Sequence, residues 1–100
     1  MKRILLDGEK MNTKEEAHVY ISKGLNFAQY YGKNLDALWD ILSTYDVPIH
    51  IVFKNTEILK NNLEQYGNRL LKVFLEASED NDNLFFEMEE WLEGVQIIEL

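Results

Sequence analysis

Asp36 and Asp40 are the residues of this chain whose type and spacing most directly suggest chemistry. Residues four apart share one face of a helix, so both carboxylates are expected on the same side. No lysine or arginine stands three or four places beyond Asp40, where the chain has Ser43 and Thr44. The two carboxylates therefore take a cation from outside their own helix, or they are solvated surface.

Three roles are open to such a pair. A general acid and a general base would need a cleft that separates their affinities for protons, and nothing nearby supplies one. Solvated helix surface is the default for an isolated pair of aspartates. A recognition patch gains support from Tyr30 and Tyr31, which come just before the helix, because tyrosine is a favoured interface anchor. On the residues alone, solvated surface and recognition patch remain level.

The helix that carries the pair is expected over residues 35–44. Its apolar stripe consists of Leu35, Leu38, Trp39 and Leu42, which recur at helical spacing. Asn34 is a good N-cap for this helix, and Gly32 is expected to permit the sharp turn before it. The rest of the fold must therefore hold a helix with one buried face and one acidic face.

Strands are expected over residues 3–6, 49–53 and 84–88, with 95–100 as a further candidate. The apolar run 3–6 suits a strand that is covered on both faces, as in a parallel sheet. Residues 84–92 also fit an amphipathic helix, and the strand is preferred there because of its aromatic residues. The alternation of strands and helices predicts a small α/β domain with a parallel sheet at its centre.

The remaining helices are placed by capping signals. Thr13 and Glu16 have the spacing of a capping box. Capping and glycine signals set the helix boundaries at Thr13 and Gly24, at Thr56 and Gly67, and at Asn68 for the start of the last helix. Together with the helix over 35–44, these signals predict about four helices around the sheet.

The composition indicates an acidic intracellular protein. The chain has 100 residues, with 18 acidic and 10 basic side chains and a formal net charge of −8. Such a surface repels nucleic acid, whose binding requires lysine and arginine at phosphates, and it should attract basic partners. On charge alone, acidity that serves only solubility is the favoured interpretation. Cysteine is absent, which fits a reducing cytoplasm. The N-terminal apolar run is too short for a signal peptide, and no stretch is long enough to span a membrane.

No catalytic, cofactor or metal motif is found. The five glycines are dispersed and form no phosphate-binding loop. His18 and His50 stand on different elements, with no acidic or thiol partner at metal spacing. A packed or surface role is the expectation for His18. We therefore expect no cofactor, no bound metal and no enzymatic activity.

The stretch from Tyr30 to Asp40, YYGKNLDALWD, resembles the signature of the barstar family, intracellular inhibitors of secreted microbial ribonucleases. Residues 73–77 resemble a second segment of that family. The similarity covers roughly residues 1–88, so that 89–100 is a C-terminal extension of a single domain over 1–100. Membership implies a three-stranded parallel sheet flanked by about four helices, to which the extension could add an edge strand.

The resemblance also implies a role for each matching position. The family inserts this helix and the loop before it into the ribonuclease active site, where RNA phosphates would lie. Asp40 would pair with the enzyme's cationic cluster, Asp36 would be the second carboxylate, and Tyr30 would pack against the catalytic histidine. Further partner contacts are expected at Tyr31, Gly32, Asn34, Leu35, Trp39, Tyr45, Val73 and Glu76.

The prediction is a bacterial, cytoplasmic inhibitor that is not an enzyme. It should bind one basic, barnase-like ribonuclease in a 1:1 complex, be a monomer when free, and bind neither nucleic acid nor membrane. Lys33 departs from the family, because the best-known member has an acidic residue there, and this cation could change which nuclease is recognised. The alternative is an acidic interaction module of the same fold with a different basic partner, since a fold does not fix its partner.

Overall fold

The sheet consists of three parallel strands, in a computed structural model that describes residues 1–27 and 31–89. The strands are β1 Lys2–Asp7, β2 Ile49–Lys54 and β3 Leu84–Met88, in the spatial order β1-β2-β3. The register places Ile51 of β2 between Ile4 of β1 and Phe86 of β3. The predicted α/β fold with a three-stranded parallel sheet is confirmed.

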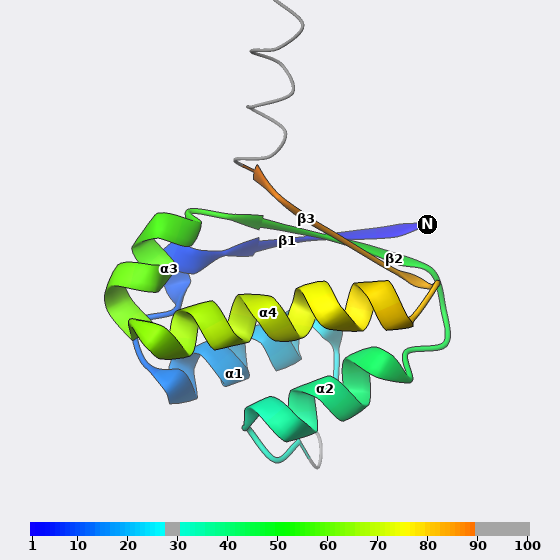
Figure 1. Ribbon diagram of the computed structural model, residues 1–100, viewed down its shortest axis with the longest axis horizontal. Coiled ribbons are helices and arrows are strands. Elements are labelled where there is room, and N and C mark those ends of the chain that lie inside the picture. The colour runs from blue at the N-terminus through cyan, green and yellow to red at the C-terminus, as the bar shows by residue number, and fades with distance from the viewer. Residues whose placement is uncertain (28–30, 90–100) are drawn as a thin grey trace, which may run out of the picture.

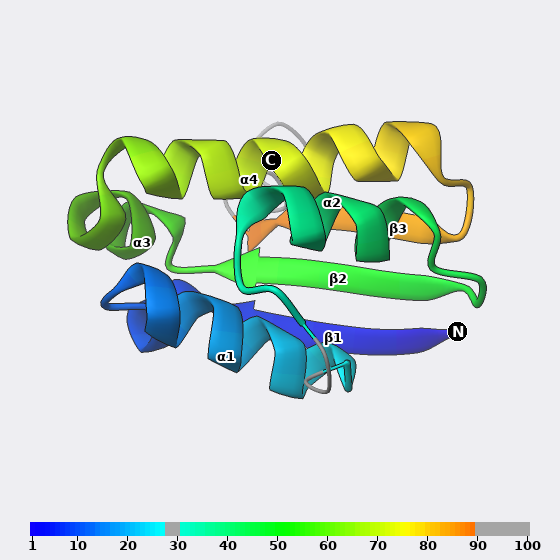
Figure 2. The same cartoon turned by 90° about the horizontal axis from the view of Figure 1, so that it is seen from below.

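Helices connect the strands and form a second layer. In the described residues they are η1 Gly8–Lys10, α1 Lys14–Leu25, α2 Leu35–Ser43, α3 Thr56–Leu63 and α4 Gln65–Asp80. Figure 1 shows α1, α2 and α4 on one side of the sheet, with α3 at the end toward which β2 points. Figure 2, seen from the helix side, shows α2 beside α4, and α1 alongside β1.

The core lies between the sheet and the helix layer. Ile49, Ile51 and Phe53 of β2 are fully buried there. Phe74 of α4 packs edge-on against Phe53, with ring centroids 5.1 Å apart, and stacks on Phe86 of β3. Burial of each such side chain stabilises the fold by about 1.5–3 kcal/mol. These contacts fix the position of α4, against which α2 packs.

The other face of the sheet carries no helix among the described residues. Leu5 of β1 is 56% exposed, and Phe85 of β3 is 47% exposed. The prediction that β1 is covered on both faces is therefore wrong. The reason is that β1 is an edge strand and that α1, α2 and α4 all lie against the opposite face.

Side-chain capping explains where α1 begins. The Thr13 hydroxyl accepts a 3.1 Å hydrogen bond from the N–H of Glu16, which confirms Thr13 as the N-cap, the first half of the predicted capping box. The helix ends at Leu25, one residue beyond the predicted Gly24, and Asn26 caps it in the left-handed conformation with a φ of 61°. Gly24 lies inside α1, where an added Cβ would come within 3.2 Å of the Leu6 side chain. This glycine serves packing on β1 rather than helix termination.

The start of α3 differs by one residue from its prediction. Thr56 is the first helical residue, and Asn55, with a left-handed φ of 56°, occupies the N-cap position without a side-chain cap. The Asn55 side chain instead donates a 2.8 Å hydrogen bond to the carboxylate of Asp7. Asn55 therefore ties the end of β1 to α3, and Thr56 is not the cap.

The break between α3 and α4 falls at Glu64, not at Gly67 as predicted. Glu64 adopts a φ of 55° and joins the two helices. Gly67 lies inside α4, where an added Cβ would be 3.1 Å from the Leu59 carbonyl oxygen. The glycine thus permits α3 and α4 to approach closely, and α4 begins before Asn68, its predicted start.

The strand predicted over residues 84–88 is confirmed as β3, and the alternative helix is wrong over this range. Residues 28–30 and 90–100 lie outside the described part of the chain. Tyr30, the candidate strand 95–100 and nearly all of the proposed extension 89–100 fall there. One domain with a C-terminal extension remains a prediction.

Candidate recognition surface

Helix α2 presents two carboxylates to solvent. Asp36 and Asp40 are exposed, whereas Leu38 and Leu42, on the opposite side of the helix, are fully buried. Within residues 1–27 and 31–89, neither aspartate takes part in an ion pair. The acidic side of α2 is therefore available to a cation from another molecule.

The N-cap fixes the direction in which this acidic side faces. The Asn34 side-chain oxygen accepts a 2.8 Å hydrogen bond from the N–H of Ala37, which confirms the predicted cap. Asp36 lies in the first turn of α2, near the positive end of the helix dipole, where a carboxylate is stabilising. The helix start is thus set by local chemistry that the stretch itself carries.

The sharp turn before α2 is made by Lys33 and not by Gly32. Lys33 has a φ of 55°, in the left-handed region that side chains with a Cβ rarely adopt, whereas Gly32 has a negative φ. An added Cβ on Gly32 would lie 3.3 Å from the Cβ of Ala37. The role predicted for Gly32 is therefore wrong. Its small size matters for close approach to α2, and the strained residue is the cation beside it.

Tyr31 points inward rather than toward solvent. Its side chain is only 8% exposed, and its hydroxyl lies 2.5 Å from Nδ1 of His18. The Nε2 atom of the same imidazole lies 2.5 Å from the hydroxyl of Tyr66. Tyr31 therefore offers little area to a partner, and the packed role expected for His18 is the one observed. Tyr30 falls outside the described residues.

Burial keeps the imidazole neutral. Desolvation lowers the pKa of His18, and the nearby carboxylate of Glu15 opposes this shift only in part. Desolvation, reinforced by the neighbouring Tyr66, raises the pKa of Tyr31. All three side chains of the cluster formed by His18, Tyr31 and Tyr66 are consequently uncharged at neutral pH.

The far end of α2 is held by a residue that sequence analysis missed. The Asn81 side-chain amide, just after α4, donates 2.9 Å hydrogen bonds to the carbonyl oxygens of Leu42 and Tyr45. Asn81 is buried, and Tyr45 is half-buried against the core. In the sequence, Asn81 is one of several polar residues in a turn, so no local signal distinguishes it.

The other expected contact residues lie on α2 and α4, which are neighbours (Figures 1 and 2). Leu35 and Trp39 of α2, and Val73 of α4, are half-buried at the edge of the core. Glu76 of α4 is exposed, with its carboxylate 3.6 Å from the ammonium group of Lys72. Their place on adjacent helices is what a single interface requires.

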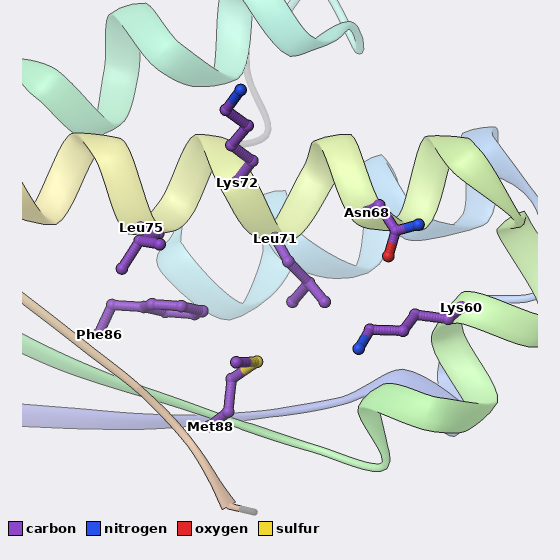
Figure 3. A pocket seen from close by; sticks show the side chains of 7 residues that line it. All are labelled: Lys60, Asn68, Leu71, Lys72, Leu75, Phe86 and Met88. Atoms are coloured by element: carbon purple, nitrogen blue, oxygen red, sulfur yellow. The ribbon is translucent and has the colours of Figure 1, made fainter. Parts of the chain in front are cut away.

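Other features of the described residues do not coincide with this surface. A hollow of about 230 Å³ lies between α4 and β3 and is lined by Lys60, Asn68, Leu71, Lys72, Leu75, Phe86 and Met88 (Figure 3). It includes none of the expected contact residues. Over 1–27 and 31–89, acidic and histidine side chains form no group of three that could hold a metal ion. No helix in the same residues has the length and apolar character needed to cross a bilayer.

Two comparisons with known proteins bear on this surface. Residues 1–90 match the family described as barstar (barnase inhibitor). The chain is also similar to a Bacillus subtilis (strain 168) protein named "Putative ribonuclease inhibitor YrdF", with 40% identity over 81 residues. That alignment covers 80% of this chain and 89% of the relative. The family match spans every described helix and strand, including α2 and the described part of the loop before it.

Proposed function

This chain belongs to the barstar family of barnase inhibitors, and we propose that it blocks the active site of a basic ribonuclease with α2 and the loop before it. The observation that carries the proposal is the pair of exposed carboxylates at Asp36 and Asp40, which have no cation among the described residues. The name of the Bacillus relative supports the same class of function.

The chemistry of a ribonuclease active site supports this role for the carboxylates. An enzyme that cleaves RNA must hold phosphates, and it does so with cationic side chains. Carboxylates on a fixed helix can take the place of those phosphates without being cleaved. Hydrogen bonds between arginine and a carboxylate are short and about twice as strong as those between neutral groups. Asp40 is proposed as the central contact and Asp36 as the second.

The surrounding residues complete the proposed interface. Gly32, Asn34 and Leu35 would meet the enzyme beside the acidic pair, with Trp39 and Tyr45 at its border. Val73 and Glu76 on α4 would lie at the rim. Because Tyr31 is buried, we propose that it anchors the loop to the core. Tyr30 is then the tyrosine proposed to contact the enzyme.

The charge of the whole chain supports rapid association with such an enzyme. The formal net charge is −8, and a basic ribonuclease would be attracted before the two surfaces touch. Fast capture suits an inhibitor that must neutralise a nuclease before it reaches cellular RNA. We propose that it does so inside the cell, in a 1:1 complex and without enzymatic activity of its own.

The cation at Lys33 supports a second candidate function, in which the partner is not a ribonuclease. This cation adjoins the acidic pair and is exposed, so it would repel part of a strongly basic active site. A less basic protein partner would tolerate it better. The same fold would then serve as an acidic interaction module.

Calorimetry tests active-site blockade. Titration of the chain into a barnase-like ribonuclease should give one binding site per enzyme. With the active site saturated by a guanosine monophosphate, the apparent affinity should fall in proportion to the nucleotide concentration. Binding that the nucleotide leaves unchanged would contradict blockade, and absence of binding would favour the module with another partner.

A further inference from the structure

We propose that His18 and Tyr66 are positioning residues for residues 31–34, the described part of the loop before α2, which they hold through the hydroxyl of Tyr31. Neither His18 nor Tyr66 is among the expected partner contacts. The inference rests on the proposed function, because the loop that contains Tyr31 leads directly into α2 and its carboxylates.

The cluster of His18, Tyr31 and Tyr66 joins three elements at one imidazole. Tyr31 meets Nδ1 of His18 from the loop, and Tyr66 meets Nε2 from α4, each at 2.5 Å. The ring of His18 is fully buried on α1. The two tyrosine rings flank it, with centroids 5.5 Å and 5.9 Å away. The loop is thus connected to both α1 and α4 through one side chain.

Tyr31 is the buried attachment of the described part of this loop. Gly32, Lys33 and Asn34, which follow it, are all exposed. The ring of Phe27 also packs edge-on against Tyr31, at 5.1 Å between centroids. The contact between the two rings is not directional, whereas the hydrogen bond to His18 fixes the position of the Tyr31 hydroxyl. A change at the imidazole should therefore reach the loop.

Burial, rather than the hydrogen-bond pattern, is what a protonated imidazole would oppose. A neutral ring has one N–H donor and one acceptor nitrogen, so one tyrosine hydroxyl accepts and the other donates. Protonation turns both nitrogens into donors, and both hydroxyls can then accept, but the charge sits on a fully buried ring whose two bonding partners are uncharged. Hydration of that charge requires the cluster to open, so the loop would be less well fixed at low pH.

The charged groups around the cluster act in opposite directions. Glu15 on α1 favours the protonated imidazole. The ammonium of Lys14 lies 4.9 Å from the centre of the Tyr66 ring, and Arg69 on α4 lowers the pKa of Tyr66. A surface hollow of about 330 Å³, lined by Lys14, Leu63, Glu64, Gln65, Tyr66 and Arg69, lies on the solvent side of Tyr66. Solvent protons can approach the cluster from that side.

Tyrosine-to-phenylalanine variants test the connection. Tyr31→Phe and Tyr66→Phe each remove one hydroxyl and keep the ring, and we expect dissociation from a barnase-like ribonuclease to become about three- to tenfold faster. Tyr20→Phe is the matched control, because the Tyr20 hydroxyl accepts a 3.0 Å hydrogen bond from the N–H of Asp7, away from the loop. It should leave dissociation unchanged.

A pH profile separates positioning from a general loss of stability. The ratio of the dissociation rates of His18→Gln and wild type cancels the titration of the enzyme's own groups. We expect this ratio to be largest near pH 8 and to fall toward one as the pH drops below the lowered pKa of His18, since wild type then loses its own neutral imidazole. A ratio that does not change with pH would overturn the proposal.

Amide hydrogen exchange in the free protein distinguishes this inference from the proposed function. If no ribonuclease binds, the proposed function fails, yet exchange at Ala37 and Leu38, whose N–H groups donate to Asn34, still reports on the end of the loop. Exchange there should be about three- to tenfold faster in Tyr66→Phe than in Tyr20→Phe, in proportion to the lost hydrogen bond. Equal exchange in the two variants would overturn the positioning role.

Discussion

The side-chain amide of Asn81 donates a 2.9 Å hydrogen bond to the carbonyl oxygen of Leu42, across the contact between the end of α4 and the end of α2. A second bond of 2.9 Å reaches the carbonyl oxygen of Tyr45. The last carbonyl groups of a helix have no partner within it. The Leu42 carbonyl also accepts a 3.4 Å bond from the N–H of Tyr45, and the shorter bond from Asn81 ties the candidate recognition helix to α4.

Asn81→Ala should destabilise the fold. It removes two hydrogen bonds of 2.9 Å and leaves the carbonyl groups of Leu42 and Tyr45 with longer ones of 3.4 Å, from the N–H of Tyr45 and the side chain of Asn83. Each lost bond costs about 0.5–1.5 kcal/mol. The change should be seen as a lower midpoint in urea denaturation. Asn62→Ala is the control, because Asn62 makes an exposed 3.1 Å hydrogen bond to Asn12. Equal midpoints for the two variants would show that the Asn81 contacts contribute nothing.

Lys33→Gly should be more stable than Lys33→Ala. Both variants remove the ammonium group, but alanine keeps the Cβ that a φ of 55° disfavours. The left-handed conformation costs a residue with a Cβ about 1–2 kcal/mol, so glycine should gain about 1 kcal/mol over alanine in the free energy of unfolding. If alanine is the more stable of the two, the conformation of Lys33 is not strained.

How far the sequence predicts the fold depends on whether the determining contacts are local. The N-caps Thr13 and Asn34 each accept a hydrogen bond from the N–H three residues later, and both were predicted correctly. The apolar runs similarly predicted the three strands and their parallel α/β arrangement. Gly24 and Gly67 were misassigned as helix ends, because the contacts that require them come from Leu6 and Leu59, on other elements.

The candidate site divides in the same way. Spacing alone predicted that Asp36 and Asp40 would share an exposed face, opposite buried leucines. It did not predict that Tyr31 would turn inward, because its partner His18 is 13 residues away and the connection also needs Tyr66. The role of Asn81 was not predicted either, because its acceptors Leu42 and Tyr45 are distant in sequence, on α2 and just after it.

Glu76→Ala should slow association with a ribonuclease more than it speeds dissociation. Glu76 is exposed and pairs with Lys72 on its own helix, so it acts as a rim charge. The expected loss is below about 1 kcal/mol, and it should shrink as salt is raised. Stopped-flow measurement at low and high salt checks both points. Lys72→Ala, the control of opposite sign, should accelerate association.

The stability of the fold should fall because of His18 as the pH drops from 6.5 toward the lowered pKa of this residue. Burial lowers the pKa of His18 from the ordinary value of 6.5, so the unfolded chain binds more protons than the folded one in this range. The stabilising contribution is complete above the unfolded pKa and is lost as pH falls toward the folded one. Urea midpoints across this range should decline more steeply in wild type than in His18→Gln. Parallel declines would contradict a buried, neutral imidazole.

Inhibition of RNA cleavage by a barnase-like ribonuclease tests the central claim most directly, with wild type compared with Asp40→Ala. Wild type should abolish cleavage at one equivalent, and Asp40→Ala should lose at least about 2 kcal/mol of binding free energy. Glu57→Ala removes an exposed carboxylate from α3, outside the proposed interface, and should inhibit like wild type. Cleavage that continues at excess wild-type protein, or Asp40→Ala that inhibits as tightly as wild type, would contradict the account.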